Sequence, residues 1–276
     1  MMSVVSNLSS LNAQRHLSQT QNRLNQNIAR LSSGLRINRA ADDASGLAIS
    51  DQLRTQVKGL SQASRNSNDG ISLIQTAEGA LNEVFGVLNR MRELSVQASN
   101  EGTMDGTQRG YLAQEFTLLE SELDRIVSVT EYNGQKLIDG SVSAGVSFQV
   151  GMRNTANDRI SVSLASVSGT QLGMNDETLS SSTGAQKAIA AIDLAIQTIN
   201  TQRGTLGATQ NRLEMTISNI GSMRENLQAA DSRIRDVDVA EETAAMSRNQ
   251  ILSQAGTSVL AQANQLPQSA LSLIGG

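Results

Sequence analysis

Apolar residues recur every three or four positions through three long segments, and this repeat restricts the fold more than any other feature of the chain. The stripes lie at Ile74, Ala77, Leu81, Val84, Leu88 and Met91; at Leu112, Phe116, Leu119, Leu123 and Ile126; and at Ile189, Ile192, Ile196, Ile199, Leu206, Leu213, Ile217, Ile220 and Leu227. This spacing places residues on one face of an α-helix, and a mean period near 3.5 is typical of coiled coils. The chain has a single proline, Pro267, so almost nothing interrupts long helices.

The stripes predict helices at about 46–99, 105–129 and 185–234. At about 1.5 Å per residue, the first helix would be about 80 Å long and the last about 75 Å. Two long helices of matched length with a shorter one alongside predict a mainly α fold, an elongated antiparallel bundle, which we assign as a rod domain over 45–234.

Between the second and third stripes the period changes to two. The segments VSFQV and ISVSL, within residues 146–164, alternate apolar and polar residues and are joined by a polar connection. This alternation predicts a β-hairpin. Its apolar face, expected to pack on the rod helices, consists of Val146, Phe148, Val150, Ile160, Val162 and Leu164.

The two ends of the chain, 1–44 and 235–276, carry helical stripes with few charges. No charged residue follows Arg248, and no acidic residue precedes Asp42. We predict a terminal two-helix coiled coil, with packing residues Leu24, Ile28, Leu31, Leu252, Val259 and Leu266. A two-helix unit cannot cover all its apolar side chains, so we expect these ends to order only against neighbouring copies, in a helical filament. A monomeric bundle with unstructured tails is the alternative.

Composition argues against most enzymes and cofactor proteins. The chain has no Cys and no Trp, and its one histidine, His16, has no partner for a metal site. Aromatic residues make up 2% of the chain, too few for the stacking platforms of nucleic-acid-binding proteins. No apolar run is long enough to cross a membrane. We predict no enzyme, no cofactor, no metal, and neither nucleic acid nor membrane as partner; the N-terminus lacks the pattern of a secretory signal, which alone would suggest the cytoplasm.

Three motifs change that last expectation. The segments LSSGLRINRAADDASGLAISDQLR (31–54), KGLSQASRNSNDGISLIQTAEGALNEV (58–84) and MSRNQILSQAGTSVLAQANQLPQSALSLI (246–274) closely resemble bacterial flagellin. The resemblance covers almost the whole chain and implies a short form with only the terminal coiled-coil domain (D0) and the rod domain (D1).

The resemblance implies a motility filament made of identical subunits, export through the flagellar type III apparatus, and an extracellular location. It also implies an export chaperone, a cap protein and hook-associated proteins as partners. A flagellar hook–filament junction protein, which shares the terminal domains, is the alternative.

Two further expectations come from the resemblance. Family members recognised by host Toll-like receptor 5 use an Arg, a Leu and a Glu that match Arg90, Leu94 and Glu115 here. Arg90 and Leu94 are four residues apart, so we expect them on a helix face left free by the core stripe; support of packing between subunits is an equal alternative. The hairpin at 146–164 matches the segment associated with supercoil switching, which implies two states with different axial repeats.

Overall fold

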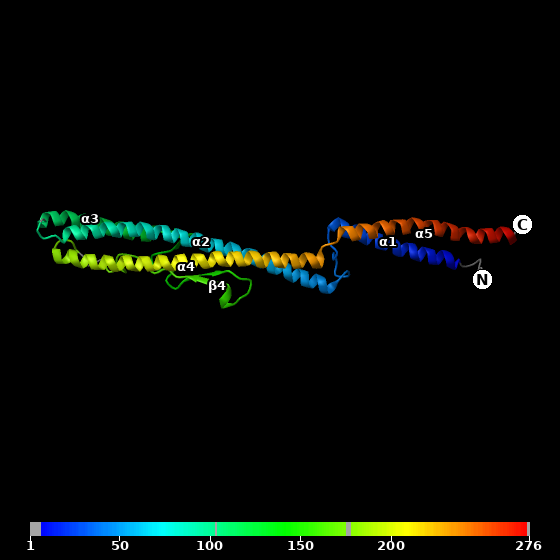
Figure 1. The fold of residues 1–276 in the computed structure, drawn as a ribbon, viewed down its shortest axis with the longest axis horizontal. Coiled ribbons are helices and arrows are strands. Elements are labelled where there is room, and N and C mark those ends of the chain that lie inside the picture. The colour runs from blue at the N-terminus through cyan, green and yellow to red at the C-terminus, as the bar shows by residue number, and fades with distance from the viewer. Residues whose placement is uncertain (1–6, 103, 175–177, 275–276) are drawn as a thin grey trace. The chain divides into compact units, whose positions relative to one another are not determined.

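The computed structural model describes residues 7–102, 104–174 and 178–274, with side chains up to residue 265. The helices of this described part are α1 (Leu8–Ser33), α2 (Ala44–Ala98), α3 (Gly106–Val129), α4 (Ser182–Arg235) and α5 (Val239–Ile274) (Figure 1). The predicted mainly α fold and its three rod helices are therefore confirmed, each with ends within three residues of the expected positions. The chain divides into two compact units, which are described separately below.

The rod unit comprises residues 56–225. Within it α2 and α4 run antiparallel, because Arg92 is paired with Asp193 at 2.7 Å while Glu78, further from the C-terminus of α2, is paired with Arg203 at 3.8 Å. Helix α3 lies alongside α2 (Figure 1), and the Arg109 side chain on α3 donates a hydrogen bond to the carbonyl of Ala98 at the end of α2.

The predicted stripes meet in one continuous core. On α2 the buried positions continue beyond the predicted stripe, since Leu94 and Ala98 are buried together with Met91. The side chains of the three helices that are almost fully excluded from solvent include Ile74, Leu81, Leu88, Phe116, Leu123, Ile192, Ile199, Leu206 and Leu213. Burial of such side chains contributes about 1.5–3 kcal/mol each, so this core is the main source of stability in the rod unit.

Helix α3 begins at a capping box. The carboxylate of Asp105 accepts a hydrogen bond from the backbone N–H of Gln108, and the Gln108 side chain accepts one from the backbone N–H of Asp105. These two bonds satisfy donors that the first helical turn leaves unpaired. They therefore fix the residue at which α3 begins, after the connection that follows α2.

Two short hairpins follow α3. Strands β3 (Val146–Gln149) and β4 (Arg159–Val162) pair antiparallel, with Phe148 opposite Ile160, as the alternation predicts. A three-residue 3₁₀ turn, Ala156–Asp158, lies in their connection. Strands β1 (Glu131–Tyr132) and β2 (Gln135–Lys136) form a second hairpin, which was not predicted.

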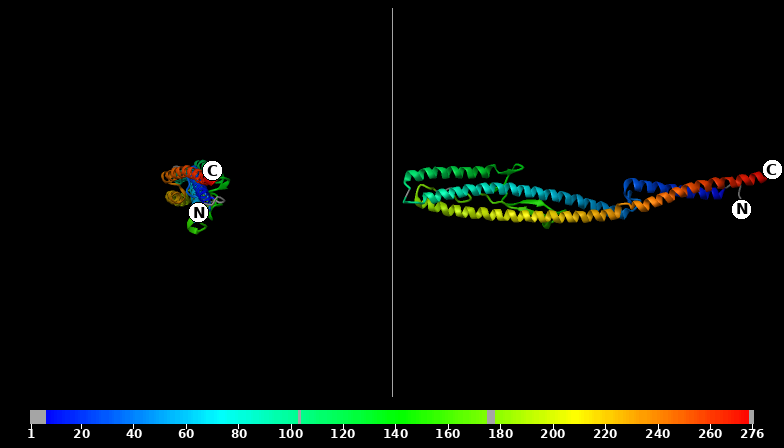
Figure 2. Two further views of the ribbon diagram at one scale, coloured as in Figure 1. Left: turned by 90° about the vertical axis from the view of Figure 1, so that its right-hand side faces the viewer. Right: turned by 45° about the horizontal axis from the view of Figure 1, so that its top comes forward.

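The terminal unit comprises residues 1–55 and 226–276. Helices α1 and α5 lie side by side (Figures 1 and 2), and they run antiparallel, because the Asn7 amide donates to the carbonyl of Ala263 while Asn27 contacts Asn249. The segment after α1 also pairs with the segment before α5, through an isolated bridge between Leu35 and Asp236. The two ends of the chain thus form the predicted two-helix arrangement.

Candidate functional site

A cluster of charges joins α2 to α3 on the surface of the rod unit. The Arg90 guanidinium donates to Oε1 of Glu115 at 2.8 and 2.9 Å and to Oε2 of Glu93 at 3.0 Å. The three side chains stay 51, 43 and 68% exposed, so they are accessible to a partner. The hydrogen bonds that Arg90 donates to Glu115, and then to Glu93, raise the pKa of Arg90, which therefore stays charged. A partner would have to compete with these carboxylates for the guanidinium.

Leu94 does not belong to that surface, and the expectation of a free face containing it is wrong. Its side chain is 1% exposed and belongs to the core. The reason is that α2 is covered by both α3 and α4, which widens its buried face beyond a single stripe. Leu94 follows Met91 by three positions and so extends that face. Of the three residues expected to meet a receptor, only Arg90 and Glu115 are on the surface.

The β3–β4 hairpin is fixed to both long helices of the rod unit. A side-chain carbon placed on Gly70 of α2 would lie 3.2 Å from Leu213 and 3.3 Å from the Phe148 ring, so glycine permits this close packing. The Asn66 amide also donates to the carbonyl of Gln149 at 2.9 Å. Val150, Ile160, Val162 and Leu164 are buried, and Val146 and Phe148 are partly buried against the core.

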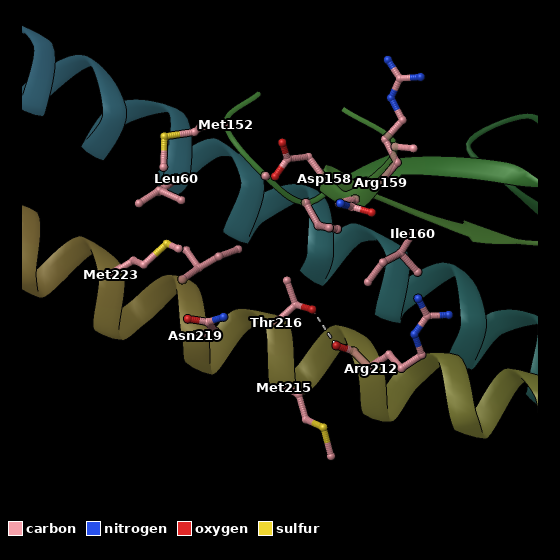
Figure 3. A pocket seen from close by; sticks show the side chains of 15 residues that line it. Leu60, Met152, Asp158, Arg159, Ile160, Arg212, Met215, Thr216, Asn219 and Met223 are labelled. Atoms are coloured by element: carbon pink, nitrogen blue, oxygen red, sulfur yellow. Dashed lines mark hydrogen bonds between the residues drawn. The ribbon is translucent and has the colours of Figure 1, made fainter. Parts of the chain in front are cut away.

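A groove of about 500 Å³ lies where the tip of this hairpin passes α4 (Figure 3). Met152 from the connection and Met223 from α4 line it together with Leu60. Arg159 and Arg212 supply positive charge, and Asp158 supplies the one carboxylate of the lining, which accepts a hydrogen bond from Thr155 at 2.8 Å. No hydrogen bond among these lining residues pairs a nucleophile with a base.

In the terminal unit, α1 and α5 face each other through leucines mixed with small and polar residues. We call this row of half-buried and buried residues the terminal seam; it consists of Ser10, Leu17, Leu24, Asn27 and Leu31 on α1 and Glu242, Asn249, Ser253, Gly256 and Ala263 on α5. On α5, Met246 and Leu260 are half-buried at the same three-four spacing. Of the predicted packing residues, Leu24 and Leu31 lie in the seam, whereas the side chain of Leu266, in α5, is outside the described part.

The large apolar side chains of α1 and α5 mostly point away from the seam. We call these the outward apolar set: Leu8, Leu11, Ile28, Ile251, Leu252 and Val259, which are 48 to 69% exposed. Ile28, Leu252 and Val259 were predicted packing residues, and the structure leaves all three uncovered within one chain. Repeated exposed apolar side chains on a helix pair with few charges indicate a surface for protein contact.

Other exposed apolar residues were not singled out by the sequence. On α3, Tyr111 and Leu118 are 70 and 65% exposed, and they lie four residues before and three after Glu115, so they share its helix face. On α4, Leu194 and Met215 are 65 and 73% exposed. In the sequence, each of these residues can be found as an apolar residue that lies outside the apolar stripe of its helix.

The described residues contain no group of His, Cys, Asp or Glu side chains arranged to hold a metal ion. Across the same residues, none of the helices combines the length and hydropathy that a membrane span requires.

Comparisons with known proteins agree with the resemblance found in the sequence. Residues 4–143 match the family model for the bacterial flagellin N-terminal helical region, and residues 189–274 match that for the C-terminal helical region. A flagellin of Halalkalibacterium halodurans is 49% identical over 268 residues, which are 97% of this chain and 98% of the relative. A flagellin of Bacillus subtilis is 43% identical over 303 aligned residues, covering 99% of this chain and 100% of the relative. The crystal structure of a Bacillus cereus flagellin is 30% identical, with a TM-score of 0.50, over 60% of this chain and 94% of that one.

Proposed function

Because the chain belongs to the bacterial flagellin family and is a structural subunit of the flagellar filament, we propose that its terminal unit assembles with neighbouring copies through the outward apolar set. The family match along nearly the whole chain does not favour the alternative of a hook–filament junction protein. We further propose the domain limits expected from the sequence, 1–44 with 235–276 for the inner domain and 45–234 for the rod domain.

One observation supports this mode of assembly above the others. Leu8 and Ile251 are 69 and 66% exposed, and they lie outside the seam in which α1 and α5 face each other. An apolar side chain gains about 1.5–3 kcal/mol when it leaves water. Neighbouring subunits can supply that gain, and the absence of charge after Arg248 means that close approach there desolvates few ions.

The experiment is seeded polymerisation of the full chain. Leu252→Ser combined with Val259→Ser removes two apolar side chains that share one face of α5, and we expect the concentration needed for assembly to rise about tenfold or more. Gln254→Ser combined with Ala261→Ser is the matched control, since both residues are exposed on α5 and have the same spacing of seven. Equal assembly of the two double variants would contradict the proposal.

We also propose that the filament works outside the cell after export through the flagellar type III apparatus, and that an export chaperone, a cap protein and hook-associated proteins are further partners. These proposals follow from family membership. Culture fractionation tests the location: the chain should appear in the sheared extracellular fraction of cells with an intact export apparatus, and remain inside cells that lack it. Retention in both strains would contradict export.

A second proposed contact involves host Toll-like receptor 5, which would meet the rod unit at Arg90 and Glu115. Their exposure and their mutual hydrogen bonds support it, while Leu94 can act only by holding α2 in place. We expect Arg90→Ala to weaken binding of the soluble subunit at least tenfold. Arg92→Ala is the matched control, because Arg92 lies on the same helix, is 46% exposed and pairs with Asp193. Equal effects of the two would remove the assignment.

For the β3–β4 hairpin we propose the role of supercoil switch. Its packing on Gly70 and Leu213 of the two long helices supports a coupling between hairpin position and rod geometry. Substitutions at Val150 or Ile160 should change the helical shape of filaments seen by electron microscopy. Unchanged filament shape across such variants would count against the switch.

A further inference from the structure

The terminal seam contains a buried polar cluster at a position where coiled coils usually place leucine. Asn27 and Glu242 are 8 and 9% exposed, and the Asn27 amide donates a hydrogen bond to Oε1 of Glu242. Asn249 in turn donates to the Asn27 side-chain oxygen at 2.8 Å, and Arg30 lies 3.8 Å from Oε2 of Glu242. The cluster thus links two residues of α1 with two of α5.

Such a cluster does not stabilise a helix pair as much as packed leucines would. Removing a carboxylate from water costs several kcal/mol, and its hydrogen bonds and its cation return that cost only when the geometry is correct. A buried asparagine in a coiled coil has the same effect: it lowers stability but penalises every register in which its partner is absent. The cluster therefore discriminates between registers more strongly than it stabilises any one of them.

The middle of the seam selects a register weakly. Leu17 packs against Gly256, where a side-chain carbon would lie 3.2 Å from its Cδ1, and Ser253 contacts Gln21 at 3.4 Å. Small residues such as these accept a leucine at several positions along α5, so a slide of one heptad would leave similar contacts. A slide would also break the hydrogen bonds from Asn7 to Ala263 and from Ser10 to Asn264 at 2.7 Å, but the second of these is exposed. At the cluster, a slide would leave buried side-chain groups without partners.

We propose that the Asn27–Glu242–Asn249 cluster, with Arg30, sets the register of α1 against α5. A fixed register also fixes the positions, along the helix axes, of the outward apolar residues of α1 relative to those of α5. The inference rests on the α1–α5 contacts alone, and its consequence for the polymer rests on the proposed assembly.

Two other features near the cluster provide competing explanations. The bridge between Leu35 and Asp236 is supported by a hydrogen bond from Val237 N–H to the Gly34 carbonyl at 3.1 Å, and it also holds the two segments together. In addition, Glu242 and Glu241 both lie in the first turn of α5, where a carboxylate is favourable for the helix dipole alone. The experiment separates these explanations from the cluster.

The absence of cysteine from the chain allows an unambiguous cross-linking test. Gln21→Cys with Ser253→Cys reports the observed register, and Gln14→Cys with Ser253→Cys reports a slide of one heptad, because Gln14 and Gln21 lie on the same groove as Ser253. Each pair is oxidised in the full chain, in the soluble and the sedimented fractions separately. Intramolecular disulfides are counted by mass spectrometry of the single-chain band.

In the parent background we expect the 21–253 disulfide to exceed the 14–253 disulfide by about tenfold or more, and in Asn27→Leu with Glu242→Leu we expect the two to agree within about threefold. Gln26→Leu with Glu241→Leu is the matched control: both residues are exposed neighbours of the cluster, and the parent ratio should persist. Glu242→Gln, which keeps an acceptor for Asn27, should also preserve the parent ratio.

Three results would overturn the proposal. An unchanged ratio in Asn27→Leu with Glu242→Leu would assign the register to the bridge or to the hydrogen bonds of Asn7 and Ser10 with α5. An equal loss in the control would assign it to general effects of leucine. Absence of the 21–253 disulfide from the parent in both fractions would show that the seam itself is not formed. A parent that forms this disulfide but never polymerises would instead contradict the proposed assembly and leave the register assignment intact.

Discussion

The α2–α4 pair of the rod unit and the α1–α5 pair of the terminal unit are built from the same three-four apolar repeat but use it in opposite ways. In the rod unit the apolar residues of the repeat are buried against other parts of the same chain, and Leu81 and Ile199, for example, are fully buried. In the α1–α5 pair the polar residues Asn27 and Glu242 are buried together with Ala263, while Leu252 is 48% exposed. One pair completes its core within the chain, and the other leaves much of its apolar surface uncovered within the chain.

The difference teaches that an apolar stripe specifies a helix without specifying what covers it. An apolar stripe is covered by its own chain where other elements of the same unit are close enough to exclude water. In the rod unit, α3 and the β3–β4 hairpin provide this cover. Where one partner helix is present, half of each helix surface stays open. The terminal pair is thus an incomplete bundle, and we propose that neighbouring copies supply the helices that cover it.

The largest effect that separates the two units is expected from a leucine truncated in each. Leu81→Ala leaves a cavity in the rod core and should lower the free energy of unfolding by about 2–5 kcal/mol. Leu252→Ala removes an exposed side chain, so the unfolding free energy of the soluble subunit should change by less than about 0.5 kcal/mol. Denaturant titration followed by circular dichroism measures both. A large loss in Leu252→Ala would mean that the terminal pair is already complete in the free subunit.

An intermediate effect is expected from filling the close contact between α2 and the hairpin. Gly70→Val would bring its side chain against Phe148 and Leu213 and should cost about 1–3 kcal/mol. Gly79→Val is the matched control on the same helix, because nothing lies within 4 Å of a side-chain carbon placed there. Thermal unfolding of the two variants should differ clearly. Similar stabilities would show that the hairpin yields easily and that the rod unit is less tightly packed than its burial indicates.

The smallest effect concerns a carboxylate in the rod unit that, unlike Glu242, has no ion-pair partner among the described residues. Burial, and then the charge of Asp124, raises the pKa of Glu120. Because the folded state holds the proton more tightly, its contribution to stability is present below the ordinary pKa and is lost as pH rises through the folded-state value. Glu120→Gln should therefore be slightly more stable than the parent at pH 7, by less than about 0.5 kcal/mol.

Unfolding of the parent and of Glu120→Gln at pH 7 and at pH 3 measures this effect. The difference should vanish at pH 3, where both side chains are neutral. A gain at pH 3 as large as that at pH 7 would assign the effect to packing of the amide rather than to charge.

The sequence predicted the helices and the β3–β4 hairpin well, because periodicity and turn composition act locally. It missed the β1–β2 hairpin, although Asn133 and Gly134, both with positive φ, carry the Asn-Gly signal of a two-residue turn. Leu94 was misplaced because the width of a buried helix face depends on how many neighbours cover it. This number is a property of the assembled bundle and not of the stripe.

The terminal seam could not be predicted for a related reason. Leu252 and Val259 form the strongest apolar feature of α5 in the sequence, yet the structure turns them outward and places Ser253 and Gly256 against α1. Periodicity gives the faces of a helix, but the choice of face depends on pairwise fits such as Leu17 on Gly256 and Asn27 with Glu242. Such fits need both helices in place.

Hydrogen–deuterium exchange of the full chain, compared between the soluble subunit and the sedimented filament, tests the central difference between the two units most directly. Amides of α2 and α4 within 56–225 should be strongly protected in both states, since their core is complete within one chain. Amides of α1 and α5 should exchange rapidly in the subunit and become protected in the filament. Equal protection of α1 and α5 in both states would contradict the account, because it would show that the terminal pair is a finished unit that needs no neighbouring copies.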